Sequence, residues 1–391
     1  MINQREKINI HSVTLLLLYI YYIIFPLEYL MSTNFGTINK ILSILISFII
    51  IIAIIINRKI NIFNINILFF IFAFLGFISF LWSIDKEKWR FFYQIYLSHI
   101  IFILIISNII LDYNESKYLD FSIIIGNLIA IILIITNKNS IADIYFYRIS
   151  LETQEGHLDP NYLAANISIA MIIVLKYIEK QRHNLIYQIL FMAMFFVFLM
   201  TGSRGAFIAF IIDCIYFVIL KKFKIKRLIK YIIIIIIIYM IAINILPEKL
   251  LNRYSIDSLI GKTDSGAGRL DIWKAAIIAI ENKPIIGYGV GSETIAIEKY
   301  YNIPKAGHNI FIQLLIEFGI IGTVIFFESI YNIKKLINKT GNIYLMILLL
   351  NVFILSLFLD PLTTKYFWIT IEYIMIYIAS YFKTGNSMRE L

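Results

Sequence analysis

Long apolar runs dominate the chain and alternate with short polar segments that hold most of its lysines and arginines. Each run is close to the roughly 20 residues that an α-helix needs to cross a bilayer. Backbone groups in lipid must be satisfied within the spanning element, which favours helices. The pattern therefore predicts an all-α, polytopic transmembrane bundle of about twelve helices, with spans near residues 11–30, 38–56, 63–82, 91–111, 119–136, 158–178, 185–201, 204–220, 229–246, 307–330, 342–359 and 365–382.

Composition excludes a water-soluble fold. The 391 residues are 60% hydrophobic and 15% charged, and the mean hydropathy is +0.82. A soluble domain carries about 45 to 50% apolar and roughly 25% charged residues, so this chain has too little polar surface to cover a core. We expect one integral membrane domain over residues 1–391. The single cysteine, Cys214, lies in an apolar run and permits neither an intramolecular disulfide nor a cysteine-based metal site.

The net charge of +10 does not indicate nucleic acid, because the cations lie mostly in short loops between spans. Lysine and arginine accumulate in cytoplasmic loops of membrane proteins. With the N-terminus inside, the inward segments hold 19 of the 35 basic residues and the short outward loops hold eight. We therefore expect both termini in the cytoplasm and a large periplasmic or extracellular loop over residues 247–306.

That loop contains a predicted short amphipathic helix within GRLDIWKAAIIAIEN, which Asp264 or Ser265 could cap and which ends at Pro284. A helix lying on the membrane surface, with Trp273 at the level of the headgroups, would fit. The GYGVG segment that follows lacks the strand and helix of a nucleotide-binding turn, so we expect it to bend the loop back to the membrane. The residues at helical spacing on one face are Leu270, Trp273, Ala276, Ile277 and Ile280.

Two arginines on the outer face are candidates for anion binding. Arg204 stands in TGSRGAF between two apolar runs, where an arginine either serves a function or snorkels to lipid phosphates. Arg269 opens the loop helix, and a guanidinium at a helix N-terminus makes a good phosphate site. Pairing of Arg269 with Asp264 or Asp271 is the alternative. Arg148, upstream on the same face, has no local feature that separates it from an ordinary loop residue.

A histidine and a helix start complete the candidate residues. His308, in KAGHNIF, could accept a proton from a hydroxyl or carry a charge beside a pyrophosphate. Alternatively, His308 and Asn309 merely cap the tenth span. Asp159, Pro160 and Asn161 read as an N-cap followed by a proline at the first helical position, and a role in substrate binding would be additional.

A second function class, a flippase or proton-coupled transporter, would use ionisable residues within the spans. The chain offers several, but they are scattered, and its informative residues gather at the outer face instead. A non-catalytic scaffold or sensor is a third class. The ionisable residues within the apolar runs are His99, Asp213, Glu317, Glu328 and Glu372.

Four segments in this order resemble the O-antigen ligase and polymerase superfamily of bacterial membrane glycosyltransferases. They are RISLETQEGHLDPNYLAAN, TGSRGAF, GRLDIW with KPIIGYGVG, and AGHNIFIQLLIEFGIIG, and they cover roughly residues 145–325. The resemblance implies a membrane enzyme that acts on sugars carried by undecaprenyl pyrophosphate, on the outer face of the bacterial cytoplasmic membrane.

In that family the arginine of the SRG turn and the arginine of the loop helix bind the donor's pyrophosphate, and the histidine before asparagine is essential. These roles fall on Arg204, Arg269 and His308, which we expect to be catalytic. The pyrophosphate is already a good leaving group, so neither a metal ion nor another cofactor is required in principle. Further substrate contacts are expected from Arg253, Asn309, Asp159 and Asn161.

The resemblance also implies the partners: the lipid-linked oligosaccharide donor, an acceptor glycan, the bilayer, a chain-length regulator and a flippase, and no nucleic acid. The motifs do not separate a polymerase from a ligase. A polymerase, which the habit of the family favours, transfers the growing glycan to the next lipid-linked repeat unit of a surface polysaccharide. A ligase transfers the finished glycan to lipid A core or to another terminal acceptor. Attack opposite the leaving group would invert the anomeric centre.

Overall fold

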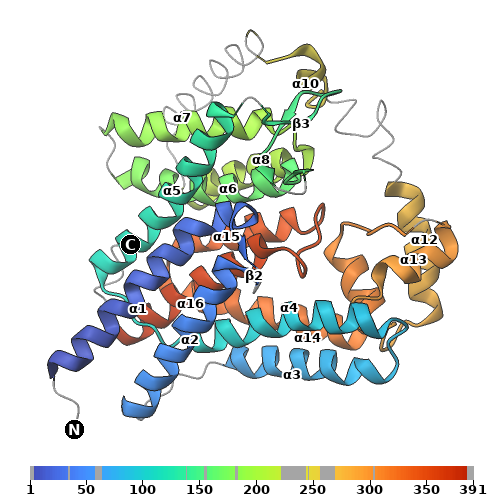
Figure 1. The fold of residues 1–391 in the computed structure, drawn as a ribbon, viewed down its shortest axis with the longest axis horizontal. Helices are drawn as coiled ribbons and strands as arrows, with labels where there is room; N and C mark the ends of the chain where they lie inside the picture. Colours follow the sequence, from blue (N-terminus) through green and yellow to red (C-terminus); the bar gives the residue numbers. More distant parts are fainter. Residues whose placement is uncertain are drawn as a thin grey trace. The chain divides into compact units, whose positions relative to one another are not determined.

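The computed structural model is almost entirely helical, which confirms the all-α class (Figure 1). Within the part of the chain that it describes there are fourteen α-helices, two short 3₁₀ helices and three two-stranded antiparallel hairpins. The described residues are 4–33, 36–57, 64–137, 139–153, 156–180, 184–221, 244, 246–255, 269–302 and 304–384. The span predicted at 229–246 lies almost wholly outside them.

Six of the described helices are long and apolar enough to cross a membrane, so the chain is a multi-pass membrane protein. Shorter apolar helices cover 67–81, 185–200 and 343–355. The total of about twelve spans and the orientation of the termini stay predictions. The six candidate spans are Ile10–Leu30, Ile38–Ile56, Lys86–Ile106, Tyr113–Thr136, Pro160–Lys180 and Ile310–Thr340.

The chain divides into two compact units, and the first comprises Met1–Ile46, Asn114–Thr263 and Ile343–Asn351. In it, α6 packs against both α7 and α8, and short hairpins lie between α5 and α6. Its elements are α1 (Gln4–Ile24), η1 (Phe25–Leu30), β1 (Ser32–Thr33), β2 (Gly36–Thr37), α5 (Tyr113–Thr136), β3 (Ile141–Asp143), β4 (Arg148–Ile149), β5 (Glu152–Thr153), β6 (Gly156–His157), α6 (Pro160–Lys180), α7 (Leu185–Met200), α8 (Arg204–Lys221) and α10 (Glu248–Asn252).

The second unit comprises Ser47–Tyr113, Asp264–Asn342 and Val352–Leu391. Here α14 packs along α3, and α12 lies against α13 and α14. The aromatic rings of Phe72 and Phe318 join α3 to α14, with centroids 4.4 Å apart. The elements are α3 (Asn64–Ile78), η2 (Ser79–Leu81), α4 (Lys86–Ile106), α12 (Arg269–Asn282), α13 (Glu293–Tyr301), α14 (Ile310–Thr340) and α16 (Lys365–Thr384), while α2 (Ile38–Asn57) and α15 (Ile343–Leu355) each begin in the first unit.

Helix α6 begins as its sequence predicts. The side chain of Asp159 accepts a hydrogen bond of 2.8 Å from the backbone of Asn161, and Pro160 is the first helical residue. An acidic N-cap satisfies a backbone N–H that has no partner within the helix, and proline loses nothing at this position. Asp159 therefore has a structural role at the start of α6.

Ionisable groups inside the helices have partners within their own unit. In the second unit, Nδ1 of His99 lies 3.0 Å from Oε1 of Glu372, and the His99 ring stacks on Trp368. In the first unit, Asp213 accepts a hydrogen bond of 2.5 Å from Asn351. Buried polar groups in apolar surroundings need such partners, so these contacts serve helix packing.

The amphipathic face predicted for the loop helix is only partly right. Helix α12 covers Arg269–Asn282 as expected, but Leu270 is 66% exposed and Ile277 is 53% exposed. Ala276 is buried, and Trp273 and Ile280 pack at the edge of the same cluster. The buried face is instead lined largely by small residues, which let α12 approach α13 and α14 closely: Ile272, Ala275, Ala276 and Ala279.

Helix α14 is broken at Gly319, whose backbone is left-handed at φ 63°. The backbone N–H groups of Tyr288 and Gly289 donate to the carbonyls of Ile316 and Glu317, at 2.7 and 3.0 Å. On the other side of the break, the N–H of Ile320 donates to the carbonyl of Pro284 at 2.8 Å. The loop that contains GYGVG is thus hydrogen-bonded into the broken helix, which accounts for backbone groups that a break would leave unsatisfied.

Candidate active site

His308 lies directly before α14 and is held by the residues that follow it. Asn309 is the N-cap of α14, and its Oδ1 accepts a 2.9 Å hydrogen bond from the N–H of Phe311. Its Nδ2 donates to the carbonyl of Leu357 at 3.2 Å, and the N–H of Ile310 donates to the carbonyl of Ser356 at 2.8 Å. The predicted capping role of Asn309 is confirmed, whereas the His308 side chain points elsewhere.

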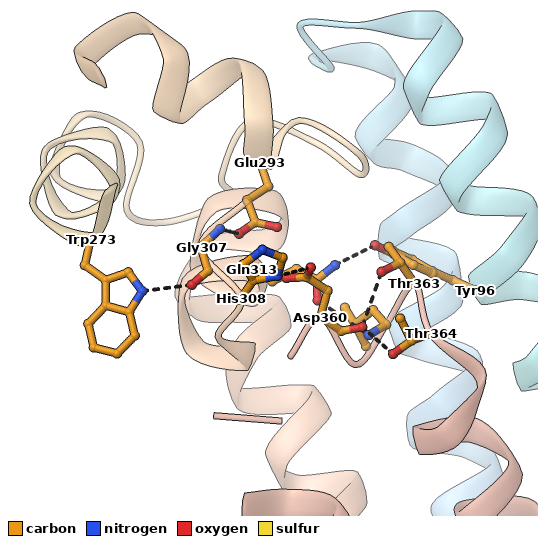
Figure 2. A network of polar contacts seen from close by, with 10 residues as sticks. Tyr96, Trp273, Glu293, Gly307, His308, Gln313, Asp360, Thr363 and Thr364 are labelled. Atoms are coloured by element: carbon orange, nitrogen blue, oxygen red, sulfur yellow. Dashed lines mark hydrogen bonds and ion pairs between the residues drawn. The ribbon is translucent and has the colours of Figure 1, made fainter. Parts of the chain in front are cut away.

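The imidazole of His308 faces Asp360, which lies in the turn before α16 (Figure 2). Nδ1 of His308 is 2.6 Å from Oδ2 of Asp360, and the side chains are 40% and 11% exposed respectively. A carboxylate on Nδ1 fixes the proton on that nitrogen and leaves Nε2 as the acceptor. The pair can therefore take a proton from a group that reaches the exposed edge of the ring.

The turn that carries Asp360 is itself hydrogen-bonded. The hydroxyl of Thr364 donates to the Asp360 carbonyl at 2.6 Å, and the hydroxyl of Thr363 does so at 3.3 Å (Figure 2). The second carboxylate oxygen of Asp360, Oδ1, is buried and makes no hydrogen bond to the described part of the chain. Sequence reasoning did not include Asp360, because LDPLTT reads as an ordinary turn between two spans.

A polar network beneath this turn joins it to α4 and α14. The Tyr96 hydroxyl donates to Glu317 at 3.0 Å, and Gln313 donates to the Tyr96 hydroxyl at 3.2 Å. Oε1 of Gln313 accepts the N–H of Leu362 at 3.4 Å. These contacts fix the segment around Asp360 relative to α14, and therefore relative to His308.

Arg269 is placed on the same framework. It is the first residue of α12, and Trp273 follows one helical turn later. The indole Nε1 of Trp273 donates to the carbonyl of Gly307 at 2.8 Å, directly before His308. The position of Trp273 at the level of the headgroups stays a prediction. The caps predicted at Asp264 and Ser265 lie outside the described residues.

In the first unit, the TGSRG turn between α7 and α8 is held by two arginines. Nε of Arg148 donates to the carbonyl of Thr201 at 2.8 Å, and Nε of Arg253 donates to the carbonyl of Gly202 at 3.1 Å. Gly202 adopts φ 62°, and a side chain there would meet Leu250 at 2.8 Å. The turn therefore needs glycine, and it ends at Arg204, the first residue of α8.

The same group contains Asn161, whose Oδ1 accepts a 2.9 Å hydrogen bond from Nη2 of Arg148. Burial lowers the pKa of the Arg148 guanidinium; Asp159 and Asp143 counteract this, and the charge of Arg204 adds to it. Arg148, Arg204 and Arg253 thus lie about one turn, and guanidinium groups are the side chains best suited to bind a phosphate or pyrophosphate.

The predicted residues thus fall into two groups, each within one unit. The first unit brings Arg204, Arg253 and Asn161 to the TGSRG turn. The second unit brings His308 and Asn309 together at the start of α14. Arg269 lies in the second unit, one turn before the tryptophan that contacts Gly307. No described set of three or more His, Cys, Asp or Glu side chains is placed to hold a metal ion.

The segments that carry these residues match a known protein family. Residues 189–327, which include the TGSRG turn, α12, GYGVG and His308, match the protein family described as O-antigen ligase. The resemblance to the O-antigen ligase family is confirmed. The matched segment contains Arg204 of the first group and Arg269 and His308 of the second unit.

The chain is also similar to several curated proteins. A ComP-specific O-oligosaccharyltransferase of Acinetobacter baylyi is 23% identical over 338 residues, which is 80% of this chain and 61% of the relative. A putative polysaccharide ligase of Rickettsia felis is 28% identical over 43% of each chain. A putative polysaccharide ligase of Rickettsia conorii is 28% identical over 44% of each chain. The chain spans less than two thirds of the length of these relatives.

Proposed function

We propose that this protein transfers a glycan from an undecaprenyl pyrophosphate carrier to a sugar hydroxyl on the outer face of the cytoplasmic membrane. The observation that carries the proposal is the 2.6 Å contact between Nδ1 of His308 and Asp360, on an imidazole that is 40% exposed. Family membership supports the class of reaction, and the arginines support a donor that bears a pyrophosphate.

In the proposed reaction, His308 is the general base. The hydroxyl oxygen of the acceptor attacks the anomeric carbon of the donor sugar, and its proton passes to Nε2 of His308. Asp360 stabilises the imidazolium that forms, because its carboxylate lies on Nδ1. General base catalysis of this kind contributes typically about 100-fold to 10,000-fold.

The bond that breaks joins the anomeric carbon to the pyrophosphate oxygen, and the electron pair leaves with the pyrophosphate. We assign neutralisation of that charge to Arg204 and Arg269, with Arg253 as a further contact. Permanent cations placed where charge develops lower the barrier to the reaction. Attack from the side opposite the pyrophosphate inverts the configuration at the anomeric centre.

Polymerisation of lipid-linked repeat units remains the reaction that we propose first. Its acceptor is a second lipid-linked glycan, so the product grows by one repeat unit per transfer. The second candidate is ligation of a finished glycan to a terminal acceptor. The names of the relatives, a putative polysaccharide ligase and an O-oligosaccharyltransferase, favour it.

The test uses purified protein in liposomes with undecaprenyl pyrophosphate-linked glycans extracted from membranes of the source bacterium. A ladder of lengthening glycans would support polymerisation, and transfer to an added acceptor without a ladder would support ligation. His308→Ala and Arg269→Ala should abolish either product, whereas His11→Ala, a change at an exposed histidine of α1, should not. Full activity of both site variants would refute the proposed site.

A further inference from the structure

The peptide unit on each side of Gly307 is held by a helix of the outer loop. Oε1 of Glu293, the first residue of α13, accepts the N–H of Gly307 at 2.8 Å. The carbonyl of Gly307 accepts the indole N–H of Trp273, on α12, also at 2.8 Å. Figure 2 shows both contacts reaching Gly307 from different helices, directly before His308.

Gly307 lies close to side chains of both α13 and α14. A Cβ atom there would lie 2.7 Å from Cγ2 of Ile312 and 3.0 Å from Oε1 of Glu293. A side chain at position 307 would therefore require Ile312 or Glu293 to shift. The location of Gly307 is thus set on three sides, by α12, α13 and α14.

His308 has a backbone conformation that needs such support. Its φ is 49°, in the left-handed region that residues with a side chain rarely adopt. A residue in this region is strained and persists only where its surroundings determine its conformation. Gly307 supplies the restraint before His308, and the hydrogen bond from Ile310 to Ser356 supplies the restraint after it.

The two helices whose side chains contact Gly307, α12 and α13, are themselves packed against α14. Their apolar side chains pack with those of α14 in a single buried cluster, which includes Ala276, Ala296, Ile297 and Ile312. Glu293 is 5% exposed, and burial raises the pKa of its carboxyl well above the usual range, with further increases from the charges of Asp360 and Glu317. The Gly307 N–H opposes that rise only in part.

We propose that Trp273 and Glu293 are positioning residues of the transfer reaction, which act through Gly307 to hold His308 in its left-handed conformation against Asp360. The inference rests on the proposed function and assigns the outer loop a part in it. In this proposal, polar side-chain atoms of α12 and α13 orient the imidazole of His308 through Gly307. An apolar residue of similar size would fill the place of Glu293 without accepting the Gly307 N–H.

Two pairs of variants test the positioning role. Trp273→Phe removes the indole N–H and keeps an aromatic ring, and its matched control is Trp82→Phe, because Nε1 of Trp82 is buried with no hydrogen-bond partner in the described chain. Glu293→Leu removes the acceptor of the Gly307 N–H, and Glu293→Gln keeps a carbonyl oxygen in its place. Folding of each variant is checked by gel filtration and by thermal unfolding in detergent.

The kinetic expectation separates positioning from binding. Trp273→Phe and Glu293→Leu should lower kcat by up to about 100-fold, the size of effect that a 1 Å misplacement of a catalytic group can produce. The KM for the lipid-linked donor should be unchanged. Glu293→Gln and Trp82→Phe should keep the kcat of the unaltered protein. A rise in KM with unchanged kcat in the first two variants would overturn the proposal.

A second readout does not depend on turnover. Diethyl pyrocarbonate modifies unprotonated imidazole, and the rate at His308 can be followed by mass spectrometry with the exposed His157 as an internal reference. Loss of the restraint on Gly307 should release His308 from Asp360. The rate at which diethyl pyrocarbonate modifies His308 should therefore rise in Trp273→Phe and Glu293→Leu, but not in Glu293→Gln or Trp82→Phe. An unchanged rate would overturn the positioning role. A raised rate in a protein without transferase activity would support it while the proposed function fails.

Discussion

Nδ1 of His308 and the carboxylate of Asp360 lie 2.6 Å apart, although one residue precedes α14 and the other precedes α16. The contact joins the starts of two helices within one unit of the chain. It gives the imidazole a defined proton, on the nitrogen that faces the acid. Asp360 is therefore as much a part of the proposed chemistry as His308.

Asp360→Asn should lower kcat by about 100-fold to 10,000-fold, because an amide of the same shape neither stabilises the imidazolium nor fixes the proton on Nδ1. The measurement is the initial rate of glycan transfer in liposomes at saturating donor. The control is Asp271→Asn, since Asp271 is exposed and pairs with Lys274 on α12. Wild-type turnover by Asp360→Asn would show that His308 acts without its acid.

Glu293 predicts a pH dependence of stability. Its pKa in the folded protein is raised, chiefly by burial, above the ordinary value of 4.5. The folded state then holds a proton that the unfolded state releases, so stability from this group is full below about pH 4.5 and falls as pH rises through the folded pKa. Thermal unfolding in detergent across this range should record the fall.

The matched variants for this effect are Glu293→Gln and Glu281→Gln. Glu293→Gln should lose the part of the pH dependence that comes from Glu293, because an amide does not ionise. Glu281 is exposed on α12, and its replacement should leave the profile as it is. If the unaltered protein, Glu293→Gln and Glu281→Gln all showed the same dependence of thermal stability on pH, the contribution assigned to Glu293 would be contradicted.

Two glycines, one inside α14 and one at its end, share a positive φ but differ in ψ, which is −165° at Gly319 and 5° at Gly341. Gly319 has φ 63°, and a Cβ there would lie 2.3 Å from the carbonyl of Ile285. Gly341, at the end of α14, has φ 69° and nothing within 4 Å of such a Cβ. Gly341→Ala should cost about 1 to 2 kcal/mol, the penalty of a left-handed residue with a side chain.

Gly319→Ala should cost clearly more than Gly341→Ala, because the backbone conformation of Gly319 is essentially restricted to glycine and because the loop that pairs with the broken helix has to move as well. The comparison is made by thermal unfolding of the two variants in the same detergent. Equal losses of stability would mean that the loop moves at no energetic cost. The residues around Ile285 would then not stabilise the break in α14.

Arg148→Lys tests how the TGSRG turn is held. Lysine keeps the charge but lacks the planar fork that reaches both the Thr201 carbonyl and Asn161. We expect the loss of hydrogen bonds from a charged group to cost about 1 to 3 kcal/mol of stability, and the KM for the donor to rise as Arg204 loses its fixed position. Arg90→Lys, at an exposed site on α4, is the control. A stable variant with unchanged KM would contradict the role of Arg148.

Much of the fold could be predicted from the sequence because bilayer thickness and helix geometry together fix the length of a spanning run. Helix starts were also readable where the signal is local. Asp159 and Pro160 at α6, and Asn309 at α14, are examples in which the side chain satisfies the backbone a few residues away.

The rest depends on contacts between distant parts of the chain. Asp360 follows an apolar run and precedes a proline, and nothing near it indicates that its carboxylate meets His308. The buried face of α12 cannot be read from the sequence for a related reason. The helix carries apolar residues on more than one side, so periodicity alone does not distinguish the exposed Leu270 from the buried Ile272.

The break in α14 has a consequence for how this sequence can change in length. Hydrogen bonds from both sides of Gly319 fix the register of Pro284 to Gly289 against Ile316 to Ile321. An insertion or deletion within either stretch would place a residue with a side chain where glycine is needed. The end of α13 is different, because Asn302 is exposed and already turns the chain at φ 61°. Added residues are best accommodated there, outside the paired register.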